Sequence, residues 1–361
     1  MNNDIGLIAL NGFRDRAEEL NNYVCLLTGA NKNYLIDFSN PRFSNGESKL
    51  VLNETVREKD IYIIADIGNY SCTYNIYGYE NHMSPDEHYI DIIRTLSAIS
   101  GKAKRTTLIL PLMYASRQHR RSARESLDCA MALRYFESLG VNNIITLDIH
   151  DPEVQNTIPT GSFDSIFPVY HVLKHLIATE KENISKDKMV VISPDAGALN
   201  RARKYASLLN LHMGFFNKRR DYTRVVDGKN PILEHEYVGP DVKDKHILVV
   251  DDMISSGESI LDLASELNKR GAKGLYVVSS FAFFTNGIDK FNKAYEDGLI
   301  KKVFSTNGSY IRDEIKNAPW FEEISVTDLF AEVIVTLNRN QSLSRLIDQT
   351  DNLNELLSEL N

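Results

Sequence analysis

Short apolar runs alternate with segments of helical spacing along nearly the whole chain of 361 residues. This alternation is typical of βα units, in which helices cover both faces of a parallel sheet, so we predict an α/β fold. The predicted strands lie at 6–10, 34–38, 61–65, 107–110, 143–147, 189–192, 212–216, 247–250 and 275–281. The predicted helices lie at 14–26, 86–99, 126–139, 197–209 and 258–269.

The length of the chain indicates two domains, because one domain typically holds about 150 residues. The stretch 158–168 contains prolines and glycines and is the predicted linker between two α/β halves. The polar end of the chain is predicted to fray or to form a short helix.

Composition excludes several classes of protein. A hydrophobic content of 43% and a charged content of 25% are ordinary for a soluble protein, and a net charge of -8 argues against a general nucleic-acid-binding surface. Cys25, Cys72 and Cys129 lack the spacing of a disulfide framework or a zinc site. The N-terminus lacks the pattern of a signal peptide, and no apolar run is long enough to cross a membrane. We therefore expect a cytoplasmic protein with neither nucleic acid nor membrane as partner.

The run ILVVDDMISSGESI, residues 247–260, carries the strongest chemical signal. A predicted strand ends in Asp251 and Asp252, and a Ser/Gly turn then opens a helix. The N-terminus of a helix favours a phosphate, and the adjacent carboxylates could accept hydrogen bonds from sugar hydroxyls. Ligands of open α/β sheets bind beyond the carboxyl ends of the strands, where this turn is predicted to lie. The alternative is an acidic strand end followed by an ordinary serine-capped helix.

Further polar clusters stand at predicted strand ends. They are RFSNGE (42–47), PLMYASRQHRR (111–121), DIHDPEVQ (148–155), SPDAGALNRAR (193–203) and FFNKRRDYTRVVD (215–227). Each also has an ordinary explanation, such as a core position for Phe43, a surface position for His150 or a plain helix entry for Asp195. The last cluster starts as a strand and becomes a basic segment that we expect to form a mobile arm.

Taken in this order, the segments resemble the ribose-phosphate pyrophosphokinase family from about residue 40 to 347. The resemblance implies two phosphoribosyltransferase-like domains, each with a mainly parallel sheet flanked by helices. The N-terminal domain, on the ATP side, would span 1–165 and be joined by a C-terminal helix at 336–347. The ribose 5-phosphate site would lie in a C-terminal domain over 166–335, with a tail over 348–361.

The resemblance also implies an activity. A ribose-phosphate diphosphokinase transfers the diphosphoryl group of ATP to the C1 hydroxyl of ribose 5-phosphate with Mg²⁺, giving 5-phospho-α-D-ribose 1-diphosphate and AMP. Such an enzyme would be a homo-oligomer, with dimer and hexamer both open. There are two alternatives. One is a non-catalytic regulator that senses the sugar phosphate, and the other is a phosphoribosyltransferase.

Matching each motif to the family gives expected roles for individual residues. The catalytic arm would contribute Lys218 and Arg220, and the metal-associated pair would be His150 and Asp195. The expected ATP-binding residues are Phe43, Asn45, Glu47, Arg117 and Gln118. The expected ribose 5-phosphate-binding residues are Asp251, Asp252, Ser255, Ser256, Gly257 and Ser259.

Three departures from the family pattern indicate a divergent, longer subgroup. Ser255 stands where the family has a carboxylate near the sugar, and Glu258 brings a negative charge close to the expected phosphate. These two residues motivate the non-catalytic alternative. The segment 68–87 is longer than usual and rich in Tyr and Asn, so we expect an added flap or interface there.

Overall fold

The computed structural model describes residues 4–121, 123–220, 232–358 and 360, with only the main chain described for 217–220, 232–235 and 351. The chain divides into two compact units. Unit 1 comprises Met1–Pro168, Asn307–Tyr310 and Ser325–Gln349. Unit 2 comprises Val169–Thr306, Ile311–Ile324 and Thr350–Asn361.

Unit 1 is built on a five-stranded sheet in the order β1-β4-β7-β8-β9, and every neighbouring pair in it is parallel. Its central strands β4, β7 and β8 are buried along almost their whole length, as expected for a parallel sheet covered on both faces. The strands are β1 (Ile5–Ala9), β4 (Asp60–Ile64), β7 (Arg105–Leu110), β8 (Asn143–Leu147) and β9 (Ser162–Ile166). The helices are η1 (Asn11–Arg16), α1 (Ala17–Thr28), α2 (Pro85–Ile99), α3 (Asp128–Ser138), η2 (Pro152–Thr157), α9 (Thr327–Asn338) and α10 (Ser344–Asp348).

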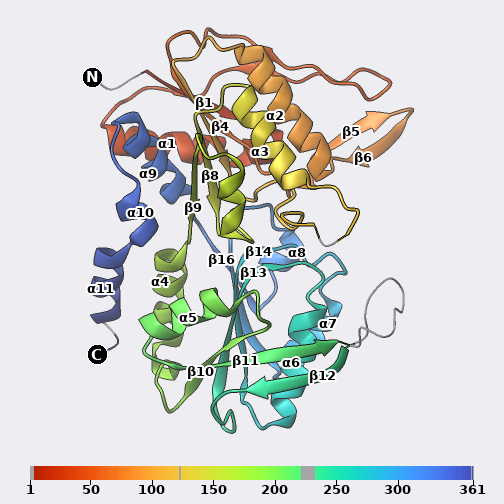
Figure 1. Cartoon of the computed structure of the whole chain (residues 1–361), viewed down its shortest axis with the longest axis vertical. Helices are drawn as coiled ribbons and strands as arrows, with labels where there is room; N and C mark the ends of the chain where they lie inside the picture. Colours follow the sequence, from red (N-terminus) through yellow and green to blue (C-terminus); the bar gives the residue numbers. More distant parts are fainter. Residues whose placement is uncertain (1–3, 122, 221–231, 359, 361) are drawn as a thin grey trace. The chain divides into compact units, whose positions relative to one another are not determined.

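Unit 1 also carries two small antiparallel hairpins outside the main sheet. One pairs β2 (Phe38–Ser39) with β3 (Val51–Leu52). The other pairs β5 (Thr73–Ile76) with β6 (Tyr79–His82) and projects beside α2 (Figure 1).

The helix α9, although close to the C-terminus of the chain, packs against α1 of unit 1. A buried hydrogen-bond network fixes its end to the sheet. The carboxylate of Asp60 accepts from Nε of Arg105 at 2.8 Å and from Nδ2 of Asn338 at 2.9 Å. Arg105 also donates to the carbonyl of Leu337 at 2.7 Å. Because a buried carboxylate is costly without partners, this network helps to determine where the helix docks.

Unit 2 is built on a seven-stranded sheet in the order β12-β11-β10-β13-β14-β15-β16. All neighbouring pairs are parallel except β11 and β12. The strands are β10 (Met189–Ser193), β11 (His212–Arg220), β12 (Ile232–Val238), β13 (His246–Ile254), β14 (Gly274–Ala282), β15 (Ile300–Thr306) and β16 (Phe321–Ile324). The helices are α4 (Val169–Glu180), η3 (Lys181–Asn183), α5 (Leu199–Leu208), α6 (Glu258–Lys269), α7 (Asp289–Glu296), α8 (Asp313–Lys316) and α11 (Thr350–Ser358).

The core of unit 2 contains a cluster of buried aromatic rings. Trp320 is fully buried, and its ring centroid lies 5.4 Å from those of Phe284 and Phe291. Nε1 of Trp320 donates to Asn292 at 2.8 Å, so the one polar atom of the indole is satisfied.

The α/β class is confirmed, and the predicted elements at 143–147 and 258–269 have the predicted bounds. Two other predictions are wrong. In 34–38 only Phe38 lies in a strand, and Leu35 forms an isolated bridge to Leu7. The predicted linker contains β9, one of the two edge strands of the sheet of unit 1. Its sequence SFDSI is largely polar and only partly buried, so no apolar run marks it. No helix in the described part of the chain is both long enough and apolar enough to span a membrane.

Candidate functional site

The predicted site residues of unit 2 gather at one edge of its sheet. Strands β11, β10 and β13 are adjacent and parallel, so their carboxyl ends meet at the same edge. Asp195 follows β10, Asp251 and Asp252 lie near the end of β13, and Lys218 and Arg220 lie near the end of β11. In open α/β sheets this is the edge at which ligands bind.

The two aspartates lie inside a strand rather than after it. Strand β13 runs to Ile254, four residues beyond the predicted end at Val250. Asp252 is buried, with 4% of its surface exposed, and its amide donates to Oδ1 of Asp251 at 2.9 Å. The sheet therefore fixes the main chain of both aspartates before any ligand is present.

Three carboxylates influence one another at this edge. Burial raises the pKa of Asp251 well above its ordinary value, and the charges of Asp252 and Asp195 raise it further. Crowded carboxylates of this kind favour a cation or hydroxyl donors that would stabilise the ionised form.

The turn over residues 255–257, called the α6 turn below, joins β13 to α6. Gly257 adopts a φ of 80°, and a Cβ there would lie 2.4 Å from the ring of Phe291, so only glycine fits without strain. The carbonyl of Ser255 accepts from the amide of Thr285 at 2.9 Å. Within the described part of the chain, the amides of Ser256 and Gly257 donate to no acceptor. Unpaired amides at a helix N-terminus form a ready anion site.

Glu258 and Ser259 belong to the first turn of α6, and both are exposed. Oε1 of Glu258 lies 3.5 Å from Nζ of Lys290 on α7. This surface ion pair is weak, but it places a positive charge beside the carboxylate that departs from the family pattern.

Asp195 forms the entry to α5. Its Oδ1 accepts from the amides of Gly197 at 2.9 Å and Ala198 at 3.2 Å, and Oγ of Ser193 donates to its carbonyl at 2.7 Å. The plain helix entry weighed above is therefore present. Oδ2 of Asp195 accepts no hydrogen bond from any residue that the structure describes, so one carboxylate oxygen remains for a ligand.

The predicted catalytic residues are placed only by their main chain. Lys218 and Arg220 belong to β11, and their side chains lie outside the described residues, as does the rest of the expected arm from 221 to 227.

In unit 1, the RFSNGE turn (residues 42–47) is closed by its own main chain. The amide of Phe43 donates to the carbonyl of Glu47 at 2.7 Å, and the amide of Gly46 donates to the carbonyl of Phe43 at 2.9 Å. Oδ1 of Asn45 accepts from the amide of Glu47 at 3.2 Å. The ring of Phe43 is 52% exposed, so it is not a core residue and its face is open to a ligand.

The RQ loop (residues 111–121) and His150 follow the adjacent parallel strands β7 and β8. Arg117 and Gln118 are exposed at this edge. Nε2 of His119 lies 3.1 Å from Oδ2 of Asp151, and the rings of His119 and His150 are 5.4 Å apart. His119 thus joins the two loops, which the sequence could not show because the histidine lies within a basic run.

The first turn of α2 links the RFSNGE turn to the RQ loop. Nη1 of Arg42 donates to Oε1 of Glu87 at 3.2 Å, and the hydroxyl of Tyr114 donates to Oδ1 of Asp86 at 2.7 Å. Neither acidic residue was predicted as part of the site, because both fit the ordinary start of a helix. The two predicted groups of ATP-binding residues are therefore held by neighbouring positions of one helix.

Comparison with known protein families agrees with this geometry. A model described as the N-terminal domain of ribose phosphate pyrophosphokinase matches residues 5–140, and a model described as the phosphoribosyl transferase domain matches residues 161–312. The chain belongs to the ribose-phosphate pyrophosphokinase family.

Individual members of the family are similar over most of their length. The ribose-phosphate pyrophosphokinase of Mycoplasma genitalium is 29% identical over 312 residues, 85% of this chain and 85% of that protein. That of Staphylococcus haemolyticus is 26% identical over 353 residues, 96% of this chain and 98% of that protein. The solved structure of phosphoribosylpyrophosphate synthetase from Mycobacterium smegmatis has a TM-score of 0.74 at 22% identity and covers 93% of this chain and 99% of its own. This likeness supports the fold.

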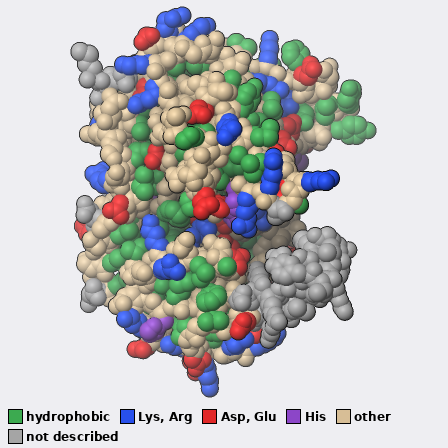
Figure 2. All heavy atoms as spheres, in the orientation of Figure 1, with side chains coloured by type: hydrophobic (Ala, Val, Ile, Leu, Met, Phe, Trp, Pro, Cys, Tyr) green, Lys and Arg blue, Asp and Glu red, His purple; other side chains and the backbone are tan. Residues whose placement is uncertain are grey.

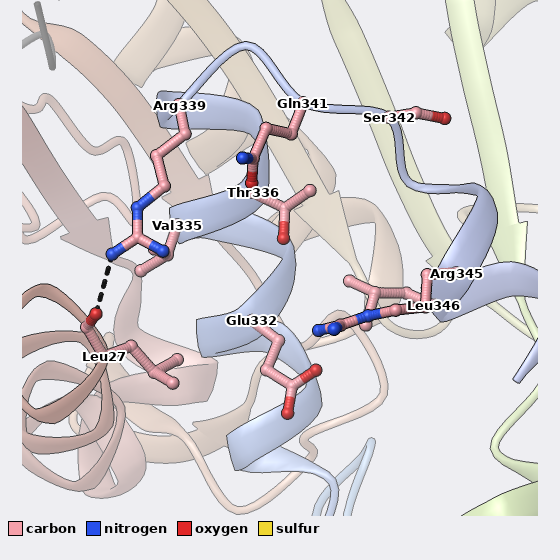
Figure 3. A pocket seen from close by; sticks show the side chains of 9 residues that line it. All are labelled: Leu27, Glu332, Val335, Thr336, Arg339, Gln341, Ser342, Arg345 and Leu346. Carbon is pink, nitrogen blue, oxygen red and sulfur yellow. Dashed lines mark hydrogen bonds between the residues drawn. The ribbon is translucent and has the colours of Figure 1, made fainter. Parts of the chain in front are cut away.

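Unit 1 also contains a pocket of about 410 Å³ that no predicted site residue lines. Figure 3 shows its side chains, which come from α1, α9, α10 and the segment between the last two helices. Arg339 donates to the carbonyl of Leu27 at 2.8 Å on one side of it. The pocket is therefore separate from the residues that the family resemblance assigns to ATP.

Proposed function

We propose that this protein is a ribose-phosphate diphosphokinase, which makes 5-phospho-α-D-ribose 1-diphosphate and AMP from ATP and ribose 5-phosphate. The observation that carries the proposal is the α6 turn, where unpaired amides at a helix N-terminus stand next to two aspartates. A ligand that carries a phosphate and hydroxyl groups close to each other fits this combination. The family membership supplies the reaction.

The sugar phosphate would bind at the edge of the sheet of unit 2. The amides of Ser256 and Gly257, with the hydroxyls of Ser255 and Ser259, would receive the 5-phosphate. Asp251 and Asp252 would accept hydrogen bonds from the ring hydroxyls. The raised pKa of Asp251 supports this role, because hydroxyl donors compensate a crowded carboxylate.

ATP would bind to residues of unit 1. The exposed ring of Phe43 would stack on adenine, and Asn45 and Glu47 would hydrogen-bond the base. Arg117 and Gln118 would contact the phosphates and the ribose. The exposure of all these side chains leaves them available for a ligand.

In the reaction, the C1 oxygen of ribose 5-phosphate attacks the β-phosphorus of ATP and loses its proton. The bond from the β-phosphorus to the oxygen that bridges it to the α-phosphorus breaks, and AMP leaves. Lys218 and Arg220 would stabilise the charge that develops on the phosphate oxygens, the first as a point charge and the second as a bidentate clamp.

We propose Mg²⁺ as the cofactor, with His150 and Asp195 as its protein partners. Mg²⁺ commonly takes only one or two protein ligands and completes its shell with water and substrate phosphates. The open carboxylate oxygen of Asp195 and the crowded acids nearby fit such a sparse site. Within the described residues, no group of three or more His, Cys, Asp or Glu side chains could hold a metal without substrate. When bound, the ion would supply positive charge between phosphate oxygens.

Three further points belong to the same proposal. The ATP side would correspond to 1–165 with the segment 336–347, and the sugar-phosphate side to 166–335. That segment is not the single helix that we predicted, since it holds the end of α9, a turn and most of α10. The protein would act in the cytoplasm. It would assemble as a homo-oligomer built from dimers of the 41.0 kDa chain, which light scattering after size exclusion would measure.

The deciding experiment is AMP release with ATP, Mg²⁺ and ribose 5-phosphate, with each component omitted in turn and the product identified by ³¹P NMR. We expect AMP only when all three are present. Asp251→Asn should abolish turnover, whereas Asp262→Asn, which changes an exposed acid on α6, should not. Binding of ribose 5-phosphate without AMP would instead support the non-catalytic regulator. Consumption of the diphosphorylated sugar with a free base would support a phosphoribosyltransferase.

A further inference from the structure

The hairpin β5–β6, called the tyrosine hairpin below (residues 73–82), lies in the segment that is longer than usual in this chain. Its turn is two residues long, and Tyr77 and Gly78 have φ values of 50° and 84°. Positive φ at both turn residues is typical of the mirror-image turns that close two-residue β-hairpins. The amide of Met83 donates to the carbonyl of Cys72 at 2.8 Å and closes the base of the hairpin.

The two faces of the tyrosine hairpin differ. Thr73 and Asn75 of β5, with Glu80 opposite Asn75, are exposed on one face. At the tip, where Figure 2 shows hydrophobic side chains gathered, Tyr77 and Tyr79 are 80% and 75% exposed. Tyr74 and Ile76 alternate with exposed residues along β5, and both are partly buried. Because alternate residues of a strand point to the same side, these two side chains form the packed face.

The packed face lies against the RFSNGE turn. The guanidinium carbon of Arg42 stands 3.8 Å from the ring centroid of Tyr74, a cation–π contact. A Cβ on Gly46 would come within 2.6 Å of Cδ1 of Ile76, so the hairpin touches the main chain of the turn itself. Both contacts therefore involve residues close to Phe43 in the turn, namely Arg42, which precedes it, and Gly46, three residues after it.

Arg42 transmits the position of the hairpin to the turn. Its Nη1 donates to the carbonyl of Gly46 at 3.1 Å and to Oε1 of Glu87 at 3.2 Å. Glu87 raises the pKa of the Tyr74 hydroxyl. Arg42 therefore contacts both Tyr74 of the hairpin and Glu87 of the first turn of α2.

We propose that Tyr74 and Ile76 are positioning residues, which hold the RFSNGE turn in the conformation that binds the base of ATP. The inference rests on the proposed function for the identity of the ligand. The turn is closed by its own main-chain hydrogen bonds, but no strand of the main sheet of unit 1 contains it, so its placement depends on contacts from the side. The tyrosine hairpin supplies such contacts.

The test compares Tyr74→Ala, Tyr74→Phe, Ile76→Ala and Asn75→Ala. We expect Tyr74→Ala to raise the KM for ATP about 10-fold, the loss expected from a partly buried cation–π contact, while kcat and the KM for ribose 5-phosphate change less than about twofold. Tyr74→Phe keeps the ring beneath Arg42 and should restore most of the affinity. Ile76→Ala should raise the KM for ATP by a smaller factor, and Asn75→Ala, which changes an exposed residue on the opposite face of the same hairpin, should have no effect.

Calorimetric titration of ATP into each variant separates this inference from the proposed function. If the wild type releases no AMP, the proposed function fails, but a 10-fold weaker binding of ATP by Tyr74→Ala still supports the positioning role. Equal ATP affinity in wild type and Tyr74→Ala overturns the inference even if the enzyme is active. Equal increases in the KM of both substrates overturn it as well, because they indicate a general loss of structure.

Discussion

The α6 turn of unit 2 and the RFSNGE turn of unit 1 place ligand-binding groups by opposite means. The acids beside the α6 turn lie on a strand of the main sheet, and the turn continues directly into a helix. The RFSNGE turn lies outside the main sheet and is held by side chains from the tyrosine hairpin and α2. In the first case the sheet positions the site, and in the second case side-chain contacts do.

This difference separates two kinds of residue. A carboxyl group fixed by strand register stays close to other carboxylates although this raises its pKa, as for Asp251. A turn fixed from the side presents an exposed ring, as for Phe43, and suits binding more than chemistry. Substitutions in unit 2 should therefore change kcat and stability, whereas substitutions around the RFSNGE turn should change the KM for ATP.

The largest effect is expected at the end of β11. Lys218→Ala or Arg220→Ala should lower kcat roughly 100-fold or more with little change in substrate affinity, because these charges act mainly on the developing phosphate charge. Steady-state kinetics with both substrates varied would measure the split. A kcat equal to that of the wild type would remove the catalytic role of both residues.

The matching change in unit 1 is Phe43→Ala. We expect the KM for ATP to rise about 10- to 100-fold, since stacking of a base on an aromatic ring contributes about 1–3 kcal/mol, while the KM for ribose 5-phosphate stays the same. Val51→Ala, another exposed hydrophobic residue near this turn in sequence, serves as control. Activity independent of Phe43 would mean that the base binds elsewhere.

The two turns each contain a glycine at positive φ, which allows a direct comparison of their surroundings. In Gly257→Ala the new methyl meets the fully buried ring of Phe291 at 2.4 Å, whereas in Gly46→Ala it meets the flexible end of Ile76 at 2.6 Å. We expect Gly257→Ala to cost about 2–5 kcal/mol and Gly46→Ala about 1–2 kcal/mol of unfolding free energy.

Urea unfolding combined with peptide-resolved hydrogen exchange would assign each of these losses to its unit. Similar losses of unfolding free energy for both variants would show that the two turns are equally rigid. This would contradict the view that the main sheet fixes one turn and side-chain contacts fix the other.

The smallest effect concerns the charge of Asp251. Its raised pKa means that the folded state holds the proton more tightly than the unfolded state. The protein therefore begins to lose stability as the pH rises above the ordinary value of 3.8, and the loss is complete once the pH exceeds the raised pKa. Without ligands, Asp251→Asn should raise the Tm at pH 8 by about 2–4 °C, roughly 1 kcal/mol, and by much less near pH 4. Scanning calorimetry at both pH values checks this, with Asp262→Asn as control. An equal rise at both pH values would contradict the proposed origin in charge.

The part of the site that follows strand ends could be predicted from the sequence. Asp251 directly follows an apolar run and Asp195 follows another after two residues, and parallel strands bring their carboxyl ends to one edge, so local pattern implied spatial proximity. The same reasoning failed for β9, whose sequence is polar because the strand is only partly buried, and only the assembled sheet shows that it is a strand. It also gave no role to Tyr74, Glu87 or His119, whose partners are distant in sequence.

By itself, the sequence determined the α/β alternation, the order of the motifs and the chemical identity of the groups at the strand ends, because periodicity and composition are local properties. Only the tertiary structure decided which side chains meet across elements, namely the tyrosine hairpin with the RFSNGE turn, α9 with α1, and Phe291 with Gly257. Such contacts depend on packing between segments that are far apart along the chain, and no local pattern records them.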